Sequence, residues 1–277
     1  MKQSRHVLSY QVIIPNGVRA TTLQGFLNWY RVLRAMILRE LKTRFAAGYL
    51  GYAWLFMEPM LHVIALTIIF SARGRQVAGD MELPVFILTG IVPFLTFTKI
   101  MRSVMSAVSA NKGLMNYRRV RPMDAMFARV TLEYFLFYLT FFTLIGIAAW
   151  MGFTIHFNAP AYLLYVPVCI CLMAFGLGAM FSIPVHLFPD FNHVASFLSR
   201  FLYFSSGIFF TVDRMPEEIR PYLMWNPLLH AVELIREGFF GGNHVSHGDP
   251  YYLGLCAVLI FSFGLSAAFT FRRRYYF

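Results

Sequence analysis

The sequence predicts an all-α, polytopic membrane protein, and three observations support this fold class. Hydrophobic residues make up 58% of the 277 residues and charged residues only 13%, about half the charged share of soluble domains. The mean hydropathy is +0.58. Residues 159–189 contain no Asp, Glu, Lys or Arg, and this run exceeds the roughly 20 apolar residues with which a helix crosses a bilayer. We therefore expect several transmembrane helices rather than a soluble core.

The chain is expected to begin with a short cytoplasmic segment followed by an amphipathic helix. Residues 1–25 have a mixed composition, without the compact apolar run or the cleavage site of a signal peptide. Over 26–46, apolar residues recur at spacings of three and four among Arg and Lys residues. A basic amphipathic helix of this kind lies in the membrane interface or packs on a partner, and both can hold. The apolar stripe consists of Phe26, Tyr30, Leu33, Ile37, Leu41 and Phe45.

Six apolar segments are expected to cross the membrane within a domain over 53–271. They cover residues 53–72, 83–105, 125–151, 160–186, 191–212 and 251–271. Lys and Arg crowd the region before the first segment, the connection between the second and third, and the tail 272–277. With six crossings these regions share one side, and the positive-inside rule places that side and both termini in the cytoplasm. Anionic lipid head groups at this side also account for the net charge of +11, without nucleic acid.

Small residues in the fourth segment predict close packing between helices. Ala174, Gly178 and Ser182 follow a small-xxx-small pattern, with Gly176 alongside. The pattern leaves open whether the neighbouring helix belongs to this chain or to a second copy. The three cysteines lie in apolar segments without metal-ligand spacing, so we expect them to be core residues.

Residues 213–242, between the fifth and sixth segments, predict a re-entrant helical hairpin on the periplasmic side. Asp213 and Pro216 can start a first short helix, Asn226-Pro227 breaks it, and Gly241-Gly242 can end a second. Both pieces are too short to cross the membrane and too apolar for a simple solvated loop. We expect this hairpin to act as a gate over something that passes.

Ionisable residues inside the predicted spans are costly unless they face protein or water, and they often mark a substrate path. Glu58 lies in the first span and Arg200 in the fifth. Either the two form a buried ion pair that joins these helices, or their faces line a passage in which Arg200 meets a carboxylate or phosphate. The residues that share these faces are Trp54, Leu61 and His62 in the first span and Ser196, Tyr203, Gly207 and Phe210 in the fifth. In the third span, Arg129 and Glu133 are spaced for a local ion pair.

Motifs for nucleotide binding and hydrolysis are absent from the sequence. It contains no GxxxxGK[ST] phosphate loop and no HExxH or GxSxG motif. We therefore expect no catalytic residue, no metal site and no cofactor in this chain. His230 and Glu233 share a helical face and are the candidate acid–base pair for an alternative, a membrane-embedded transferase. A self-sufficient channel is a further alternative.

Several stretches resemble the membrane subunits of type-2 ABC exporters, most of all those that export capsular polysaccharide and their O-antigen relatives. The resemblance covers nearly the whole chain from about residue 26. The matching stretches are Arg39-Glu40-Leu41-Lys42-Thr43-Arg44-Phe45, residues 48–59 (GYLGYAWLFMEP), residues 111–115 (NKGLM) with Arg121-Pro122, and residues 225–237, which contain Trp-Asn-Pro-Leu and Glu-Leu-Ile-Arg-Glu.

This resemblance implies a homodimer in the bacterial inner membrane that binds two copies of a separate ATPase, which hold ATP and Mg. It implies that 26–46 is an interface helix, that 107–121 is a coupling segment seated on the ATPase, and that spans one and five line the channel. The implied coupling residues are Asn111, Lys112, Leu114, Met115 and Arg118, and the implied periplasmic gate residues are Trp225, Asn226, Pro227, Glu233 and Arg236.

The cargo that the resemblance suggests is a lipid-anchored acidic polysaccharide. Its expected partners in the envelope are a periplasmic polysaccharide co-polymerase adaptor and an outer-membrane channel. O-antigen, teichoic acid or another lipid-linked substrate are alternatives within the same class. Residues 1–25 lie outside the resemblance, and no role is predicted for them.

Overall fold

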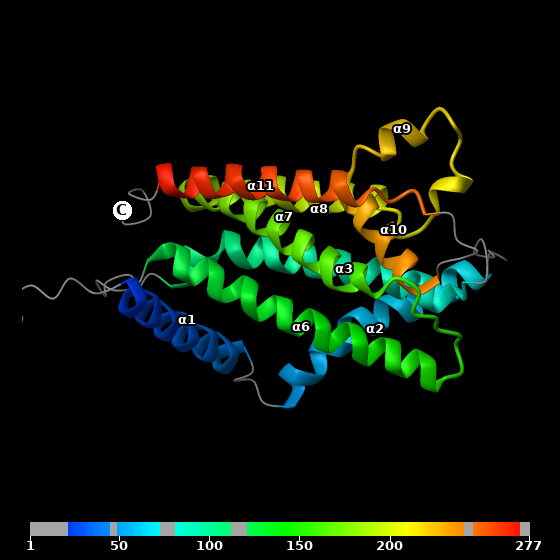
Figure 1. Cartoon of the computed structure of the whole chain (residues 1–277), viewed down its shortest axis with the longest axis horizontal. Helices are drawn as coiled ribbons and strands as arrows, with labels where there is room; N and C mark the ends of the chain where they lie inside the picture. Colours follow the sequence, from blue (N-terminus) through cyan, green and yellow to red (C-terminus); the bar gives the residue numbers. More distant parts are fainter. Residues whose placement is uncertain (1–21, 45–48, 73–80, 112–120, 241–245, 272–277) are drawn as a thin grey trace, which may run out of the picture.

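The computed structural model describes residues 22–44, 49–72, 81–111, 121–240 and 246–271, and these parts are predominantly helical. Five of their helices are long and apolar enough to cross a membrane: α2, α3, α6, α7 and α11. Figure 1 shows them running side by side along the long axis of the molecule. The elements are α1 (Thr22–Arg44), α2 (Tyr49–Ala72), α3 (Leu83–Met105), α4 (Ala107–Ala110), α6 (Pro122–Trp150), α7 (Pro160–Leu187), α8 (Phe191–Ser205), the 3₁₀ turn η1 (Val212–Arg214), α9 (Arg220–Leu223), α10 (Pro227–Phe240) and α11 (Pro250–Thr270).

Helices α3 and α7 form the centre of the bundle. In the most apolar stretch of α7, 72% of the residues are buried, against 11% in α2. Helix α7 packs between α3 and α11, and α6 covers another side of α3. Helix α2 also packs on α3, at the periphery of the bundle. A nonpolar helix that is buried all round belongs in a core, whereas α2 keeps a broad apolar face for lipid or for a partner.

The small residues of α7 are used for packing within this chain. A Cβ atom on Gly176 would lie 2.3 Å from the carbonyl oxygen of Ile260 in α11. A Cβ atom on Gly178 would lie 2.7 Å from the carbonyl oxygen of Met101 in α3. The pattern in the fourth span is thus explained by close approach of α7 to both neighbouring helices.

The fifth predicted span does not form one continuous helix over 191–212. Helix α8 has 15 residues, which is about 22 Å at 1.5 Å per residue and less than the ~30 Å hydrocarbon core. The chain then leaves the helix, and Gly207 adopts a φ of +71° that side chains disfavour. The length of the apolar segment predicted a helix that continues to residue 212, whereas α8 ends at Ser205. The backbone carbonyl groups of Ile208 and Phe210, which no longer bond within a helix, accept hydrogen bonds from Arg236 of α10.

The outer connection is also less regular than the sequence suggests. In place of a helix started by Pro216, a turn leads into the four-residue helix α9. Asp213 does not cap that helix, because its carboxylate instead pairs with His247. The second helix is confirmed as α10, which begins at Pro227. Gly241 and Gly242 lie outside the described residues.

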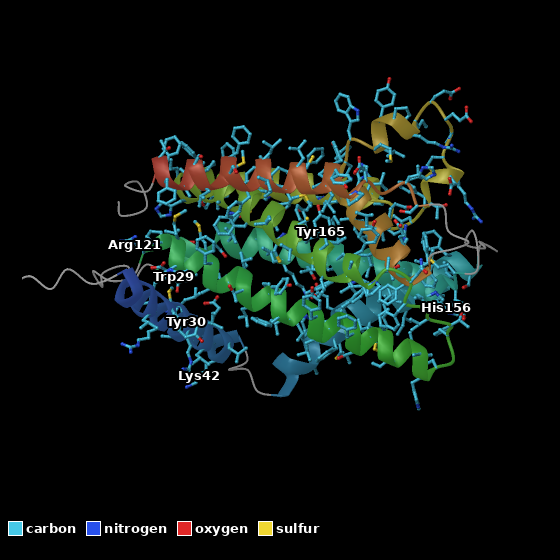
Figure 2. All side chains as sticks on the ribbon, viewed as in Figure 1. Trp29, Tyr30, Lys42, Arg121, His156 and Tyr165 are labelled. Atoms are coloured by element: carbon cyan, nitrogen blue, oxygen red, sulfur yellow. The ribbon has the colours of Figure 1, made fainter. Side chains whose placement is uncertain are left out.

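Helix α1 covers most of the segment 26–46 that was predicted to be an amphipathic helix, and part of the apolar stripe of this segment is turned toward the protein. Figure 1 shows α1 alongside the first half of α6. Ile37 and Leu41 pack on Leu132 and Leu136 of α6. Tyr30, which Figure 2 labels on the same helix, is 53% exposed. The described part of the stripe thus splits between the bundle and the surroundings; residues 1–21 and 45–46 lie outside the description.

Candidate functional site

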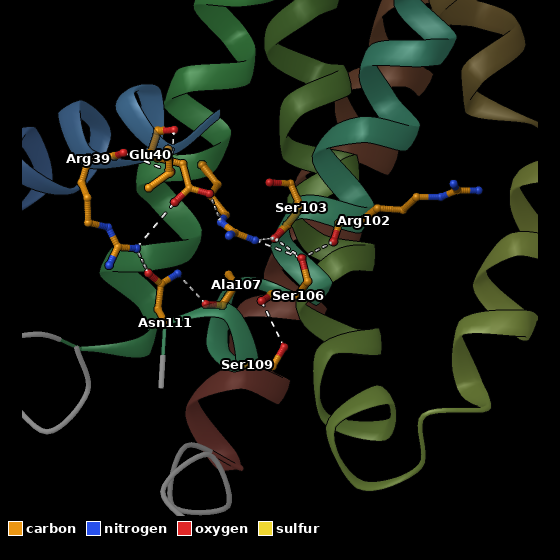
Figure 3. A network of polar contacts seen from close by, with 10 residues as sticks. Arg39, Glu40, Arg102, Ser103, Ser106, Ala107, Ser109 and Asn111 are labelled. Atoms are coloured by element: carbon orange, nitrogen blue, oxygen red, sulfur yellow. Dashed lines mark hydrogen bonds and ion pairs between the residues drawn. The ribbon is translucent and has the colours of Figure 1, made fainter. Parts of the chain in front are cut away.

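A polar network joins α1, α3 and α6, as Figure 3 shows. The carboxylate of Glu40 lies 2.7 Å from the guanidinium of Arg129. Arg129 also donates to the carbonyl oxygen of Ser103 at 2.7 Å and to the hydroxyl of Ser106 at 3.0 Å. Ser106 is the single residue between α3 and α4. Arg129 therefore connects the amphipathic helix to the point at which α3 ends.

The same network continues to Asn111, directly after α4. The guanidinium of Arg39 donates to the side-chain oxygen of Asn111, and the amide of Asn111 donates to the carbonyl oxygen of Ala107 at 2.7 Å. Asn111 is buried. Helix α1 thus binds Asn111 after α4 directly through Arg39, and it reaches Ser106 before α4 indirectly, through the Glu40–Arg129 pair. The other coupling residues that the resemblance implies lie outside the described residues: Lys112, Leu114, Met115 and Arg118.

An open cavity of about 450 Å³ lies beside this network. Lys99 and Arg102 of α3 line it together with the Glu40–Arg129 pair and Glu133. The cavity is charged, but Lys99 and Arg129 are already paired with carboxylates. Since paired charges neutralise one another, this arrangement favours a link between helices over a site for a charged ligand.

Glu58 of α2 pairs with Lys99, and not with Arg200 as one of the two sequence-based interpretations had it. The Glu58 carboxylate lies 2.7 Å from the Lys99 ammonium. Arg200 is exposed on α8, where its Nε donates to the carbonyl oxygen of Ser196 at 3.4 Å. Lys99 lies within α3, more than a turn before the end of this helix at Met105.

The residues predicted to line a passage are only partly on common faces. On α2, Trp54 and His62 are exposed while Glu58 turns toward α3. On α8, Arg200 is exposed, whereas Tyr203 packs against Phe94 of α3 with ring centroids 5.2 Å apart. Gly207 and Phe210 lie beyond the end of α8, so the predicted helical face is wrong there.

Arg236 of α10 is the most completely buried of the predicted gate residues. Its guanidinium is fully buried and stacks 3.6 Å from the centre of the Phe86 ring. It donates to the carbonyl oxygens of Phe86, Ile208 and Phe210, each at 3.4 Å. Glu233 lies 3.2 Å away as its counter-ion. Burial lowers the pKa of Arg236 to about 10, against the opposing effect of Glu233, so the group stays cationic at neutral pH.

Asn226 supplies a second attachment of α10 to the end of α8. Its side-chain amide donates to the hydroxyls of Ser205 at 3.0 Å and Ser206 at 3.1 Å. Its side-chain oxygen accepts from the backbone N–H of Leu228 at 3.0 Å, in the manner of an N-cap. Asn226 before the start of α10 and Arg236 in the second half of α10 thus bind the end of α8 and the nonhelical residues that follow it. We call these two residues and Glu233 the α10 clamp.

His230 and Glu233 do not form the acid–base pair that a transferase would need. Both ring nitrogens of the buried His230 are occupied by backbone groups: Nδ1 accepts from the N–H of Asp249 at 2.9 Å, and Nε2 donates to the carbonyl oxygen of Met224 at 2.8 Å. Glu233 pairs with Arg236. The transferase interpretation therefore loses its candidate pair.

The family of the chain follows from comparison with known proteins. Residues 31–240 match the model of the ABC-2 type transporter family. This match spans α1 from Arg31, the polar network and the α10 clamp. The chain belongs to the ABC-2 type transporter family.

Three relatives of this ABC-2 permease are similar over nearly their whole length. The polysialic acid transport protein KpsM of Escherichia coli is 35% identical over 237 residues, 84% of this chain and 91% of KpsM. The capsule polysaccharide export inner-membrane protein CtrC of Neisseria meningitidis serogroup A is 28% identical over 260 residues, 92% of this chain and 96% of CtrC. The corresponding protein BexB of Haemophilus influenzae is 27% identical over 255 residues, 90% of this chain and 94% of BexB.

Membership of this family confirms the resemblance and the division of labour that it implied. The ABC-2 permease is the membrane component, and a separate subunit hydrolyses ATP. What the sequence-based interpretation missed is the role of Glu40 and Lys99. Glu40 could have been noticed as the single acidic residue in α1, among the basic residues of that helix. An isolated charge of opposite sign is a signal for a specific partner.

Proposed function

We propose that this ABC-2 permease subunit forms the membrane path of an ATP-driven exporter of lipid-anchored acidic capsular polysaccharide in the bacterial inner membrane. The observation that carries this proposal is similarity over most of the chain to inner-membrane proteins whose names assign them to polysialic acid transport and capsule polysaccharide export. The multi-pass helical bundle supports the same conclusion.

The proposed topology has six crossings with both termini in the cytoplasm. In it, α8 and residues 206–211 together make the fifth crossing, and 213–242 is the periplasmic gate hairpin. Two features support it: in Figure 1 the start of α1 and the end of α11 lie at one end of the bundle, and α9 and α10 lie at the other. Nonhelical backbone at membrane depth is tolerated where protein satisfies it, as the α10 clamp does here.

The proposed assembly is a homodimer with two ATPase subunits, and in the envelope a periplasmic adaptor and an outer-membrane channel. Helices α2 and α8 expose apolar side chains along their lengths, among them Trp54, Ile68, Phe197 and Phe204. Such faces suit a second copy that closes a path between the α2 and α8 helices of two protomers. The ATPase would sit at the α1–α4 end, over the coupling segment 107–121.

The ATPase partnership is tested by capturing the chain in mild detergent and assaying ATP hydrolysis. An ATP-hydrolysing subunit is expected at equal stoichiometry. It should be lost when Leu114 and Met115 are both replaced by Asp, because charges disfavour an apolar contact surface. Replacing Leu259 and Phe263 on the far face of α11 by Ser serves as the control, with retained capture expected. If neither the unaltered chain nor the Leu259/Phe263 control captures an ATPase, the proposal is refuted.

The substrate path is tested at Arg200, the exposed cation of α8. Arg200→Ala should lower surface capsular polysaccharide, and Arg200→Lys should retain more of it, because a passing acidic group needs a positive charge at this point. The amount of permease in the membrane is measured in parallel, since an exposed side chain is not expected to support folding. Normal export by Arg200→Ala would remove this residue from the path.

A further inference from the structure

Three large aromatic side chains project from the end of the bundle that carries α9 and α10. Tyr222 and Trp225 are each 79% exposed, and Tyr251 is 88% exposed. None of their polar ring atoms has a hydrogen-bond partner among the described residues. Figure 2 shows ring-bearing side chains pointing outward from the region of α9. Large exposed aromatic groups of this kind mark a surface that contacts something.

Tyr251 fixes the depth of this surface relative to the membrane. It is the second residue of α11, a candidate spanning helix. It also begins the outward face of that helix, where Leu255, Val258, Leu259 and Phe263 follow at helical spacing and are 47–66% exposed. An apolar stripe on a spanning helix faces hydrocarbon, so its first residue lies where hydrocarbon gives way to head groups.

Hydrogen bonds hold Trp225 and Tyr222 at the same depth relative to the membrane as Tyr251. The hydroxyl of Tyr252 donates to the carbonyl oxygen of Trp225 at 2.9 Å, which attaches Trp225 to the first turn of α11. The N–H of Trp225 in turn donates to the carbonyl oxygen of Tyr222 at 3.4 Å. Earlier in the connection between α8 and α10, Glu217 and Glu218 are exposed, as charged residues in contact with water should be. The three rings therefore lie between an acidic, hydrated segment and an apolar helix face.

We propose that Tyr222, Trp225 and Tyr251 form an anchor that rests in the lipid head-group region and sets the height of the α9 connection at the membrane surface. Their rings are apolar on their faces, and their hydroxyl and indole N–H groups, which have no hydrogen-bond partner in the described part of the chain, suit ester and phosphate acceptors. Trp225 directly precedes Asn226 of the α10 clamp. The anchor thus couples the position of α10 to the membrane surface. Only the assignment to the outer leaflet rests on the proposed topology.

Quenching of Trp225 fluorescence tests the anchor. The chain has four tryptophans, so Trp29, Trp54 and Trp150 are replaced by Phe to leave Trp225 alone. The full-length variant is reconstituted into vesicles of lipids with bromine near the head groups or near the chain ends. Shallow bromine should quench more strongly than deep bromine. A variant that retains only Trp150, the last residue of α6 and 88% exposed, should show the same order. If the triple replacement lowers yield, the Trp225 signal is taken as the difference between wild type and Trp225→Phe.

Two other outcomes would overturn the proposal. Quenching by aqueous iodide alone would place Trp225 in water, and protection from iodide and bromine alike would show that a macromolecule, such as a glycan or a second copy, covers the surface. Adding Tyr222→Ser and Tyr251→Ser should weaken shallow bromine quenching and increase iodide quenching; no change would remove these two residues from the anchor. The measurement needs no ATPase and no cargo, so its failure is distinct from failure of the proposed export function.

Discussion

Replacing Arg236 by Met is expected to destabilise the protein more than any other single change considered for it. The substitution removes the cation from a fully buried site and leaves Glu233, which is 1% exposed, without its counter-ion. It also deprives the carbonyl oxygens of Phe86, Ile208 and Phe210 of a donor. Breaking a buried charge pair on one side costs about 3–5 kcal/mol. We expect a large drop in the unfolding temperature in detergent and loss of surface polysaccharide.

The control for Arg236→Met is Arg34→Met, which removes an exposed cation from α1. Surface substitutions of this kind change stability by at most about 0.5 kcal/mol. Arg236→Lys should fall between the two, because a single ammonium retains the charge but does not match the fork of donors that a guanidinium presents. Equal unfolding temperatures for Arg236→Met and Arg34→Met would show that Arg236 contributes nothing to the stability of the protein.

The α10 clamp also explains where the sequence-based prediction of the fifth span was incomplete. Asn226, Pro227, Glu233 and Arg236 were identified through the resemblance, as gate residues without a physical role. In the structure, Asn226 and Arg236 bind groups of residues 205–210. The end of α8 thus depends on hydrogen-bond donors that come later in the chain. Helix propensity and apolar length reflect nearby residues only, so the sequence around residue 205 contains no sign of this helix end except Gly207.

Long apolar segments, by contrast, were predictable from composition and length. The observed α3, α7 and α11 begin and end within a few residues of the predicted segments 83–105, 160–186 and 251–271. Their starts coincide with Pro residues at the first or second helical position, a local signal that the sequence does contain.

Partners of intramembrane charges could not be predicted, because they depend on how the helices rotate against one another. Glu58 was expected to meet Arg200 or a passage, but the rotation of α2 against α3 brings it to Lys99. Periodicity shows which residues share a face, but it does not show which neighbouring helix that face meets.

Replacing Arg129 by Leu is expected to separate export from ATP hydrolysis. Arg129 is 11% exposed and connects Glu40 of α1 to Ser103 and Ser106 at the end of α3. Directly after that point come α4 and Asn111, which α1 also contacts. If the ATPase acts on this end of the bundle, a displacement of the coupling segment reaches α3 and α6 through these contacts. Coupling energies of 1–3 kcal/mol are typical, so we expect export to fall by about tenfold or more.

The measurement compares surface polysaccharide with ATP hydrolysis by the purified complex. Arg129→Leu and Glu40→Gln should each lower export while the ATPase remains bound and active. Lys42→Gln, at an exposed position two residues from Glu40, should leave export unchanged. Because Glu40 and Arg129 contact each other, the double variant should lose less than the sum of the two single effects. Strictly additive losses would show that Glu40 and Arg129 act independently, and full export by Arg129→Leu would remove Arg129 from the path between the ATPase and the membrane helices. Reduced export with retained ATP hydrolysis, together with non-additive losses, identifies the ion pair as part of that path.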